Sequence, residues 1–348
     1  MNRKLKVLHV TPMYPTVERP ARGTFVKSQI DSLAGLVDSE VHVIEGGQGP
    51  APYLQDLGLL RRKLRGDFDV IHVHYGNLAT MVKMLGTGGT PVVTSYCGTD
   101  LLGDRPTTGK PRMRDRFYSP LNRYFARHDA HAIVKSAVLA RQVESIVESL
   151  SIVPNGVDIT KFRPMDQEQC RRKVGLADER RPVILFGADP ANQIKNFSLV
   201  ESALSKFLAD TFRVLTFAGG KIKHEDIPVY MNAADLVILT SHHEGSPNVV
   251  KEATACSRPV YGTPCGDVEY MLDGIGGSRV IGYNAAKWAR AFQDLLNGDL
   301  PMRNNGHEKL VEKGIDTGSI ARKLTAIYRK AAGWPEEEKV DRPLPLAA

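Results

Sequence analysis

Residues 235–256 read DLVILTSHHEGSPNVVKEATAC, and this stretch determines how the rest of the chain is interpreted. Its apolar first part, from Asp235 to Thr240, is typical of a buried parallel strand. Ser246 is a good helix N-cap, and Pro247 fits the first helical position, where its missing N–H costs nothing. The stretch therefore predicts a strand, a loop and a helix in immediate succession.

The predicted start of this helix suits an anion. The backbone N–H groups of Asn248 and Val249 are expected to be free in the first turn, at the positive end of the helix dipole. Glu244 falls in the preceding loop and Glu252 on the helix, so two carboxylates beside the anion could hold a sugar nucleotide by its hydroxyls. An ordinary strand–loop–helix unit with two solvated glutamates fits the spacing equally well.

Strands and helices alternate along the whole chain in two sets. Apolar runs of the first set begin near residues 5, 40, 69, 91, 130 and 151, and those of the second near 181, 212, 235 and 259. This alternation predicts parallel, doubly wound sheets that bind ligands beyond the carboxyl ends of their strands. A turn and linker, Asn155 to Pro164, separates the sets. The sequence therefore predicts two α/β halves joined near residue 160, with a ligand cleft between them.

Four residues outside the opening stretch stand at or after predicted strand ends. They are Gly23, His74, Asp100 and, in a polar loop of the second half, Lys195. A single residue of this kind is weak support for a site, and a strand-end histidine such as His74 is more often structural.

Composition is that of an ordinary soluble protein. No window of about twenty apolar residues occurs, and the apolar run after the basic N-terminus stops at Pro12, too early for a signal peptide. The four cysteines form no C-x-x-C pair, so neither disulfides nor a structural zinc is expected. We therefore expect a cytoplasmic protein.

The net charge of +7 is concentrated in two basic clusters, one around residues 61–65 and one from Arg105 to Arg127. Solvated faces are the simpler interpretation. The alternative is peripheral docking to an anionic membrane or binding of a phosphorylated acceptor, which Met113, Phe117 and Tyr118 beside the bases support. The basic residues are not interleaved with stacking aromatics in a repeated pattern, and no segment resembles a nucleic-acid-binding module, so nucleic acid is not an expected partner.

Two motifs are specific when they occur in one chain. Glu244 and Glu252 form an E-x7-E pattern, and residues 153–158 read VPNGVD. With supporting segments at 11–12, 23–26, 69–74 and 186–196, the chain resembles the family 4 glycosyltransferases over about residues 5–330. Within that family, the chain resembles the teichuronic-acid type of glycosyltransferase.

The resemblance implies an α/β protein of the GT-B fold, with two Rossmann-like doubly wound domains that face a cleft. We assign residues 1–163 to an acceptor-side domain and 164–317 to a nucleotide-sugar-binding domain. Residues 318–332 are assigned to a helix that packs back near the domain junction, and 333–348 to a tail.

The resemblance also implies roles for individual residues. Glu252 would bind the ribose hydroxyls, Glu244 the transferred sugar, and Lys195 the diphosphate, whose departing charge must be stabilised. Gly23 would let the backbone approach the diphosphate closely. The remaining donor contacts would come from Gly245, Ser246, Asn248 and Val249, while His74 and Asp100 are candidates for the sugar side of the reaction.

Two positions depart from the family pattern. The loop before Lys195, residues 188–194, has no arginine, although family members usually carry one there. Cys97 stands where many members have a histidine or arginine, and a thiol cannot supply a cation. Another group must therefore share the diphosphate charge, and His74 or Asp100 could cover the position of Cys97.

The implied activity is retaining transfer of a sugar from a nucleotide-diphosphate sugar to an acceptor hydroxyl of a sugar or lipid-linked acceptor. A UDP-sugar is favoured and a GDP-sugar is the alternative, in polysaccharide, glycolipid or other glycoconjugate biosynthesis. No metal-ligand spacing occurs, and Lys195 with the helix-end amides can replace magnesium. The alternatives are a sugar-nucleotide epimerase of the same fold and a binding protein that has lost catalysis. A Rossmann dehydrogenase is disfavoured, because no G-x-G-x-x-G follows the first strand.

Overall fold

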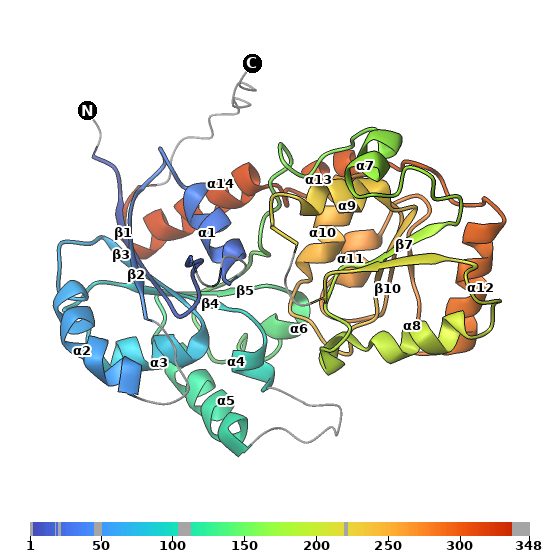
Figure 1. The fold of residues 1–348 in the computed structure, drawn as a ribbon. Helices are drawn as coiled ribbons and strands as arrows, with labels where there is room; N and C mark the ends of the chain where they lie inside the picture. Colours follow the sequence, from blue (N-terminus) through green and yellow to red (C-terminus); the bar gives the residue numbers. More distant parts are fainter. Residues whose placement is uncertain are drawn as a thin grey trace.

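The protein folds into two α/β domains, each built on its own parallel sheet (Figure 1). The structure is a computed structural model that describes residues 3–17, 19, 22–44, 51–103, 113–218 and 222–335. For residues 51–55 and 113–117 only the backbone is described. The predicted architecture of two doubly wound sheets is confirmed.

The N-terminal sheet has the strand order β2-β1-β3-β4-β5-β6, with all pairs parallel. Strands β3 to β5 are buried along their whole length, because helices cover both faces of their Val- and Ile-rich runs. The winding direction reverses between β1 and β3, which makes their carboxyl ends the switch point of this domain. The strands are β1 (Lys6–Thr11), β2 (Asp38–Val43), β3 (Val70–His74), β4 (Val92–Tyr96), β5 (His131–Val134) and β6 (Leu150–Ile152).

The helices of this domain are α1 (Thr24–Asp31), α2 (Ala51–Lys63), α3 (Gly76–Leu85), α4 (Thr99–Leu102), α5 (Met113–Ala126) and α6 (Ala137–Ala140). The sequence from Ala137 to Ile146 predicts one longer helix, and the structure confirms only its first part. Helix α6 ends at Ala140. Turns with hydrogen bonds between residues three apart follow, and they bring Val143 into the core.

The C-terminal sheet has the order β11-β10-β9-β7-β8 and is also parallel. Its switch point lies between β7 and β9. The strands are β7 (Val183–Phe186), β8 (Arg213–Thr216), β9 (Leu236–Leu239), β10 (Val260–Gly262) and β11 (Arg279–Val280). The helices are α7 (Gln167–Lys173), the 3-10 turn η1 (Gln193–Lys195), α8 (Phe197–Leu204), α9 (Ile227–Ala233), α10 (Asn248–Ala255), α11 (Val268–Leu272), α12 (Ala285–Leu296), α13 (Gly306–Glu312) and α14 (Thr317–Ala331).

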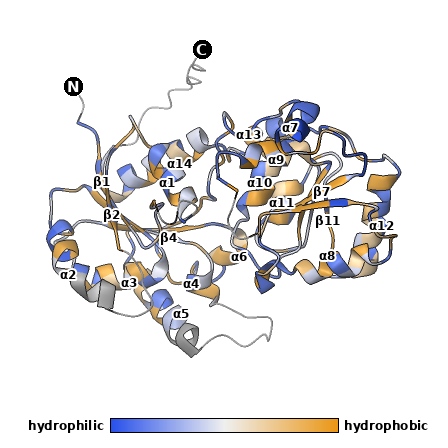
Figure 2. Cartoon of the chain, viewed as in Figure 1, coloured by the Kyte–Doolittle hydropathy of each residue, from blue (hydrophilic) through white to orange (hydrophobic). Residues whose placement is uncertain are grey.

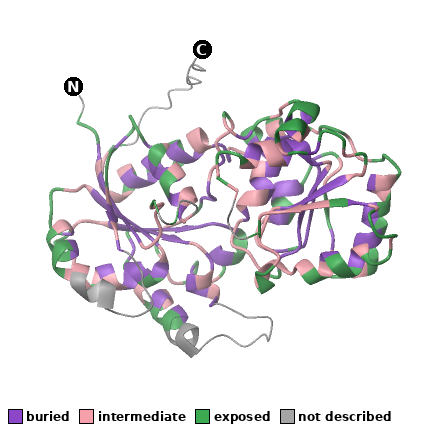
Figure 3. Ribbon diagram, in the orientation of Figure 1, coloured by how far each residue is buried: buried purple, intermediate pink, exposed green. Residues whose placement is uncertain are grey.

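The sheets form the apolar centre of each domain, and the helices turn their polar faces outward. The central strands are mainly hydrophobic in Figure 2 and buried in Figure 3, whereas the outer helix faces are hydrophilic and exposed. Among the described helices, none combines the length and apolarity that a membrane crossing requires.

The last helix, α14, returns from the C-terminal domain to the N-terminal one. The chain crosses between the domains where Val157 and Asp316 form an isolated parallel bridge. Beyond it, α14 lies beside α1 and β4 (Figure 1), and its Leu324 and Tyr328 join the core of the N-terminal sheet. The second crossing therefore completes the core of the first domain.

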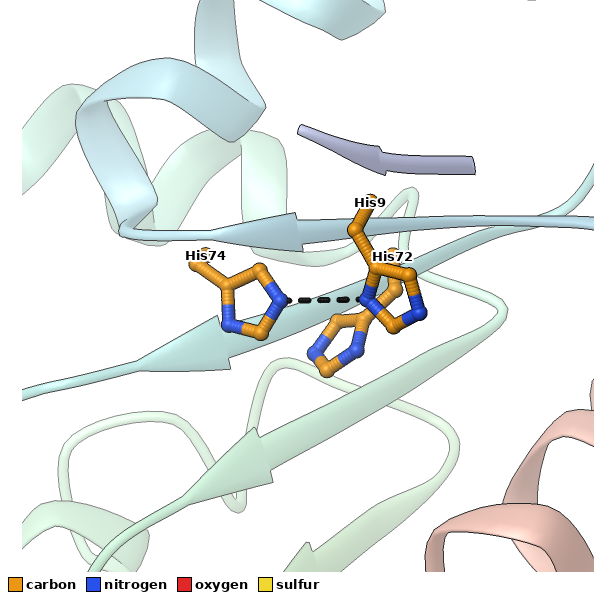
Figure 4. A group of neighbouring side chains, drawn as sticks. All are labelled: His9, His72 and His74. Atoms are coloured by element: carbon orange, nitrogen blue, oxygen red, sulfur yellow. Dashed lines mark hydrogen bonds between the residues drawn. The ribbon is translucent and has the colours of Figure 1, made fainter. Parts of the chain in front are cut away.

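Three histidines lie together inside the N-terminal sheet (Figure 4). His9 Nδ1 is 3.3 Å from His74 Nε2, and His72 Nδ1 is 2.6 Å from Tyr328 Oη on α14. His72 Nε2 is also 2.8 Å from Ser95 Oγ. Burial lowers the pKa of each ring well below its usual range, so the three histidines are neutral hydrogen-bonding groups in the core.

Candidate active site

The prediction that Ser246 caps α10 is wrong. The helix begins at Asn248, and Pro247 occupies the cap position in an extended conformation (φ −71°, ψ 120°). Ser246 Oγ instead donates to Asp267 Oδ2 at 2.7 Å and accepts from Lys251 Nζ at 3.1 Å. Because the Ser246 hydroxyl is bound to the Asp267 carboxylate, it does not cap α10. The first turn of the helix therefore stays open toward the cleft.

Lys195 and Glu244 form an ion pair at the switch point of the C-terminal sheet. Lys195 Nζ is 2.5 Å from Glu244 Oε1, which also accepts from Ser241 Oγ at 2.8 Å. The loops that carry them are joined, because Thr240 Oγ1 donates to the Lys195 carbonyl at 2.8 Å. Both charged groups are therefore held at the carboxyl edge of the sheet, as the strand pattern predicts.

A cavity of about 340 Å³ lies over this ion pair, between the domains. Lys195 and Glu244 line it from the C-terminal domain, and Phe25, Cys97 and Lys135 from the N-terminal domain. The structure thus places most predicted donor-binding residues on one wall, the others there being Gly245, Ser246, Asn248, Val249 and Glu252.

Glu252 stands between this cavity and a second one of about 420 Å³. Its side chain is 15% exposed, and burial raises its pKa to about 7. On the far side, Lys161 Nζ is 2.6 Å from His224 Nδ1, and His224 Nε2 is 3.9 Å from Glu252 Oε1. Near neutral pH the carboxyl exchanges between its two states, and a ligand that donates hydroxyl hydrogens to it would favour the carboxylate.

Glycines allow the backbones to approach each other at this site. A Cβ on Gly245 would lie 2.4 Å from the carbonyl oxygen of Cys97, which belongs to the opposite domain. Gly23 has φ 69° at the start of α1, and a Cβ there would lie 2.4 Å from the carbonyl of Met13. Gly23 does not line either cavity, so its own domain already requires a glycine at that position.

His74 and Asp100 are not on the wall of the cavity over the ion pair. His74 belongs to the buried histidine group described above. The Asp100 carboxylate accepts hydrogen bonds from the backbone N–H groups of Gly76, Cys97 and Gly98. Asp100 therefore shapes the loop that carries Cys97, and neither residue reaches the space expected for the sugar.

Sequence reasoning missed Lys135. It follows directly after the carboxyl end of β5, is 3% exposed and lines the cavity beside Cys97. The rule that ligands bind beyond strand ends could have found it, because β5 itself was predicted. Burial raises the pKa of the Cys97 thiol to about 12, so this side chain is neutral near pH 7.

The structure describes only part of the second basic cluster. Residues 105–112 and the side chains of residues 113–117 lie outside the described residues. Arg123 donates to the Leu101 carbonyl at 3.0 Å and to Gln142 Oε1 at 2.7 Å, so it fastens α5 to the domain. Lys63 forms an ion pair with Glu40 at 2.6 Å.

Comparison with known families identifies both halves of the chain. Residues 3–161 match the family described as Glycosyltransferase Family 4, and residues 177–298 match Glycosyl transferases group 1. The chain is a glycosyltransferase of the family 4 type. The two matched regions are carried by the two sheets, and the candidate cavity lies where they face each other.

The sequence of this glycosyltransferase matches curated relatives over most of their length. It is 28% identical over 337 residues to a D-inositol 3-phosphate glycosyltransferase of Actinosynnema mirum, covering 81% of this chain and 78% of that protein. It is 26% identical over 332 residues to the protein of the same name from Pseudarthrobacter chlorophenolicus, covering 81% and 74%. The teichuronic-acid type stays a prediction.

Solved structures confirm the GT-B fold of the glycosyltransferase. Sucrose-phosphate synthase from Thermosynechococcus elongatus aligns with a TM-score of 0.73 at 16% identity, covering 94% of this chain and 99% of that one. Anabaena HepE, solved in complex with UDP and glucose, aligns with a TM-score of 0.67 at 15% identity, covering 92% and 98%.

Proposed function

We propose that this glycosyltransferase is a retaining enzyme that transfers a sugar from a UDP-sugar to an acceptor hydroxyl in the cleft. The observation that carries the proposal is the single cavity that gathers Lys195, Glu244, Glu252 and the open first turn of α10. The complexes of HepE with UDP and with UDP-glucose support uridine over guanosine as the donor base. A GDP-sugar is the alternative.

Each group has a role that follows from its chemistry. Glu252 accepts hydrogen bonds from the ribose hydroxyls, and Glu244 binds hydroxyls of the transferred sugar. Lys195 and the amides of Asn248 and Val249 stabilise the negative charge that develops on the departing diphosphate. The acceptor hydroxyl attacks the face that the diphosphate leaves, and the departing phosphate oxygen takes its proton. Because an ammonium and helix-end amides can balance that charge, the reaction proceeds without a divalent metal.

The acceptor binds on the N-terminal side of the cleft. The relatives named D-inositol 3-phosphate glycosyltransferases favour a small phosphorylated acceptor that bears hydroxyl groups. A sugar or lipid-linked acceptor, in polysaccharide or glycolipid synthesis by a cytoplasmic protein that docks on the inner membrane face, is the alternative that the basic clusters suggest.

A ligand screen followed by a transfer assay tests this proposal. UDP and UDP-sugars should raise the thermal midpoint more than the guanosine and adenosine analogues, because a ligand that binds only the folded state stabilises it. Proton NMR of the first product formed should then show the same anomeric configuration as the donor. Inversion would refute the retaining mechanism. A changed sugar nucleotide in the absence of acceptor would indicate an epimerase, and binding without transfer to any acceptor a protein that has lost catalysis.

A further inference from the structure

Lys195 alone supplies less positive charge than a bound diphosphate would require. Residues 188–194, which precede Lys195, contain no arginine. Lys195 also already pairs with Glu244, whose carboxylate offsets its charge. Among the described residues that line this cavity, the second cation is Lys135, which comes from the opposite domain.

Lys135 is a buried ammonium group that has no hydrogen-bond partner among the described residues. Its side chain leaves the carboxyl end of β5, whose backbone is paired with strands on both sides. A charged group in such a place costs free energy unless an opposite charge or several acceptors compensate it.

The groups around Lys135 compensate its charge only in part, because burial lowers the pKa of Lys135 despite the opposing effects of Cys97 and Asp100. The carboxylate of Asp100 is already occupied by backbone N–H donors, and the Cys97 thiol is neutral because burial raises its pKa to about 12. Burial also keeps His72 and His74 neutral by lowering their pKa values. Burial lowers the pKa of Lys251 on α10 to about 8; the Asp267 carboxylate raises this pKa and Lys135 lowers it, so Lys251 lies close enough to Lys135 to repel it. The surroundings are therefore arranged for an anion that arrives with a ligand.

We propose that the Nζ of Lys135 binds the diphosphate of the donor from the N-terminal domain and so replaces the missing arginine. The assignment rests on the proposed use of a nucleotide-diphosphate sugar. With Lys195 on one wall and Lys135 on the other, the diphosphate is held by both domains at once. Donor binding thereby fixes the separation of the domains. When the diphosphate leaves, the domains are free to move apart.

Replacing Lys135 with methionine tests the assignment, because methionine keeps much of the volume and removes the charge. Calorimetry should show UDP binding weakened by about tenfold or more, since a hydrogen bond to a charged group is lost. Uridine binding, measured by NMR titration, should be unchanged. The thermal midpoint without ligand should rise, because an uncompensated buried charge has been removed. Lys135→Arg should recover part of the UDP affinity.

The exposed Lys287 provides the control, since Lys287→Met removes the same charge from the outer face of α12. That variant should match the wild type in every measurement. Unchanged UDP affinity in Lys135→Met, an equal loss for uridine, or an effect confined to the KM of the acceptor would each overturn the assignment. Wild-type protein that binds no nucleoside diphosphate would overturn the proposed function itself, and the assignment of Lys135 with it.

Discussion

Replacing Glu252 with glutamine keeps the shape of the side chain and removes the charge that burial disfavours. Burial raises the pKa of Glu252 from 4.5 to about 7, so the folded wild type retains a proton that the unfolded chain has lost between these values. Its stability therefore falls as pH rises through this window, while that of the glutamine variant does not. By thermodynamic linkage, this shift lowers the free energy of unfolding of the wild type by about 0.8 kcal/mol at pH 5 and about 3 kcal/mol at pH 8. These are upper values, because 15% of the side chain remains exposed.

Thermal unfolding of both proteins without ligand at pH 5, 6, 7 and 8 measures this difference. A change of about 2.5 kcal/mol in a domain of this size corresponds to a relative gain of about 5–10 °C for Glu252→Gln between pH 5 and pH 8. Glu269→Gln, on an exposed face of the same domain, should show a difference from wild type that does not vary with pH. A constant difference for Glu252→Gln as well would refute the buried-carboxyl reasoning. UDP affinity should fall in the same variant, and unchanged affinity would contradict the ribose role.

Three further perturbations act on other parts of the site. Glu244→Ala should lower kcat more than UDP affinity, because its carboxylate faces the transferred sugar; rates and calorimetry separate the two, and a loss confined to UDP affinity would contradict this role. Gly245→Ala places a methyl group 2.4 Å from the Cys97 carbonyl oxygen and should reduce turnover by about a hundredfold by displacing the domains, whereas Gly58→Ala, which meets no atom within 4 Å, should be active. EDTA should leave the initial transfer rate unchanged, and a loss restored by magnesium would refute metal independence.

The fold could be predicted well because periodicity acts locally. Short runs such as Val70–His74 and Val183–Phe186 are rich in Val and Ile and are buried along their whole length, and their length and flanking turns favour a buried parallel strand. Short elements were harder. The four-residue α4 and the two-residue β11 carry too few residues for a periodic pattern, and neither was predicted.

The candidate site was predicted where motif and strand end coincide, as for Lys195 and Glu244. Prediction failed for Ser246 because its hydroxyl is used by Asp267, which lies 21 residues away in the sequence. Lys135 was missed for a related reason. Its place directly after β5 could have been noticed, but its lack of a hydrogen-bond partner among the described residues depends on segments distant in the sequence.

The return of α14 to the first domain has a consequence for biosynthesis. Tyr328, which bonds to His72 in the core, is translated 256 residues after it. Until then the face of the N-terminal sheet that includes Val7 and Val93 lacks the part of its cover that α14 supplies, although all its strands have been synthesised. By that stage all strands of the C-terminal sheet have been synthesised. The N-terminal domain, which usually folds first, therefore completes its core last. We therefore expect the nascent chain to expose part of this apolar face until α14 has been synthesised.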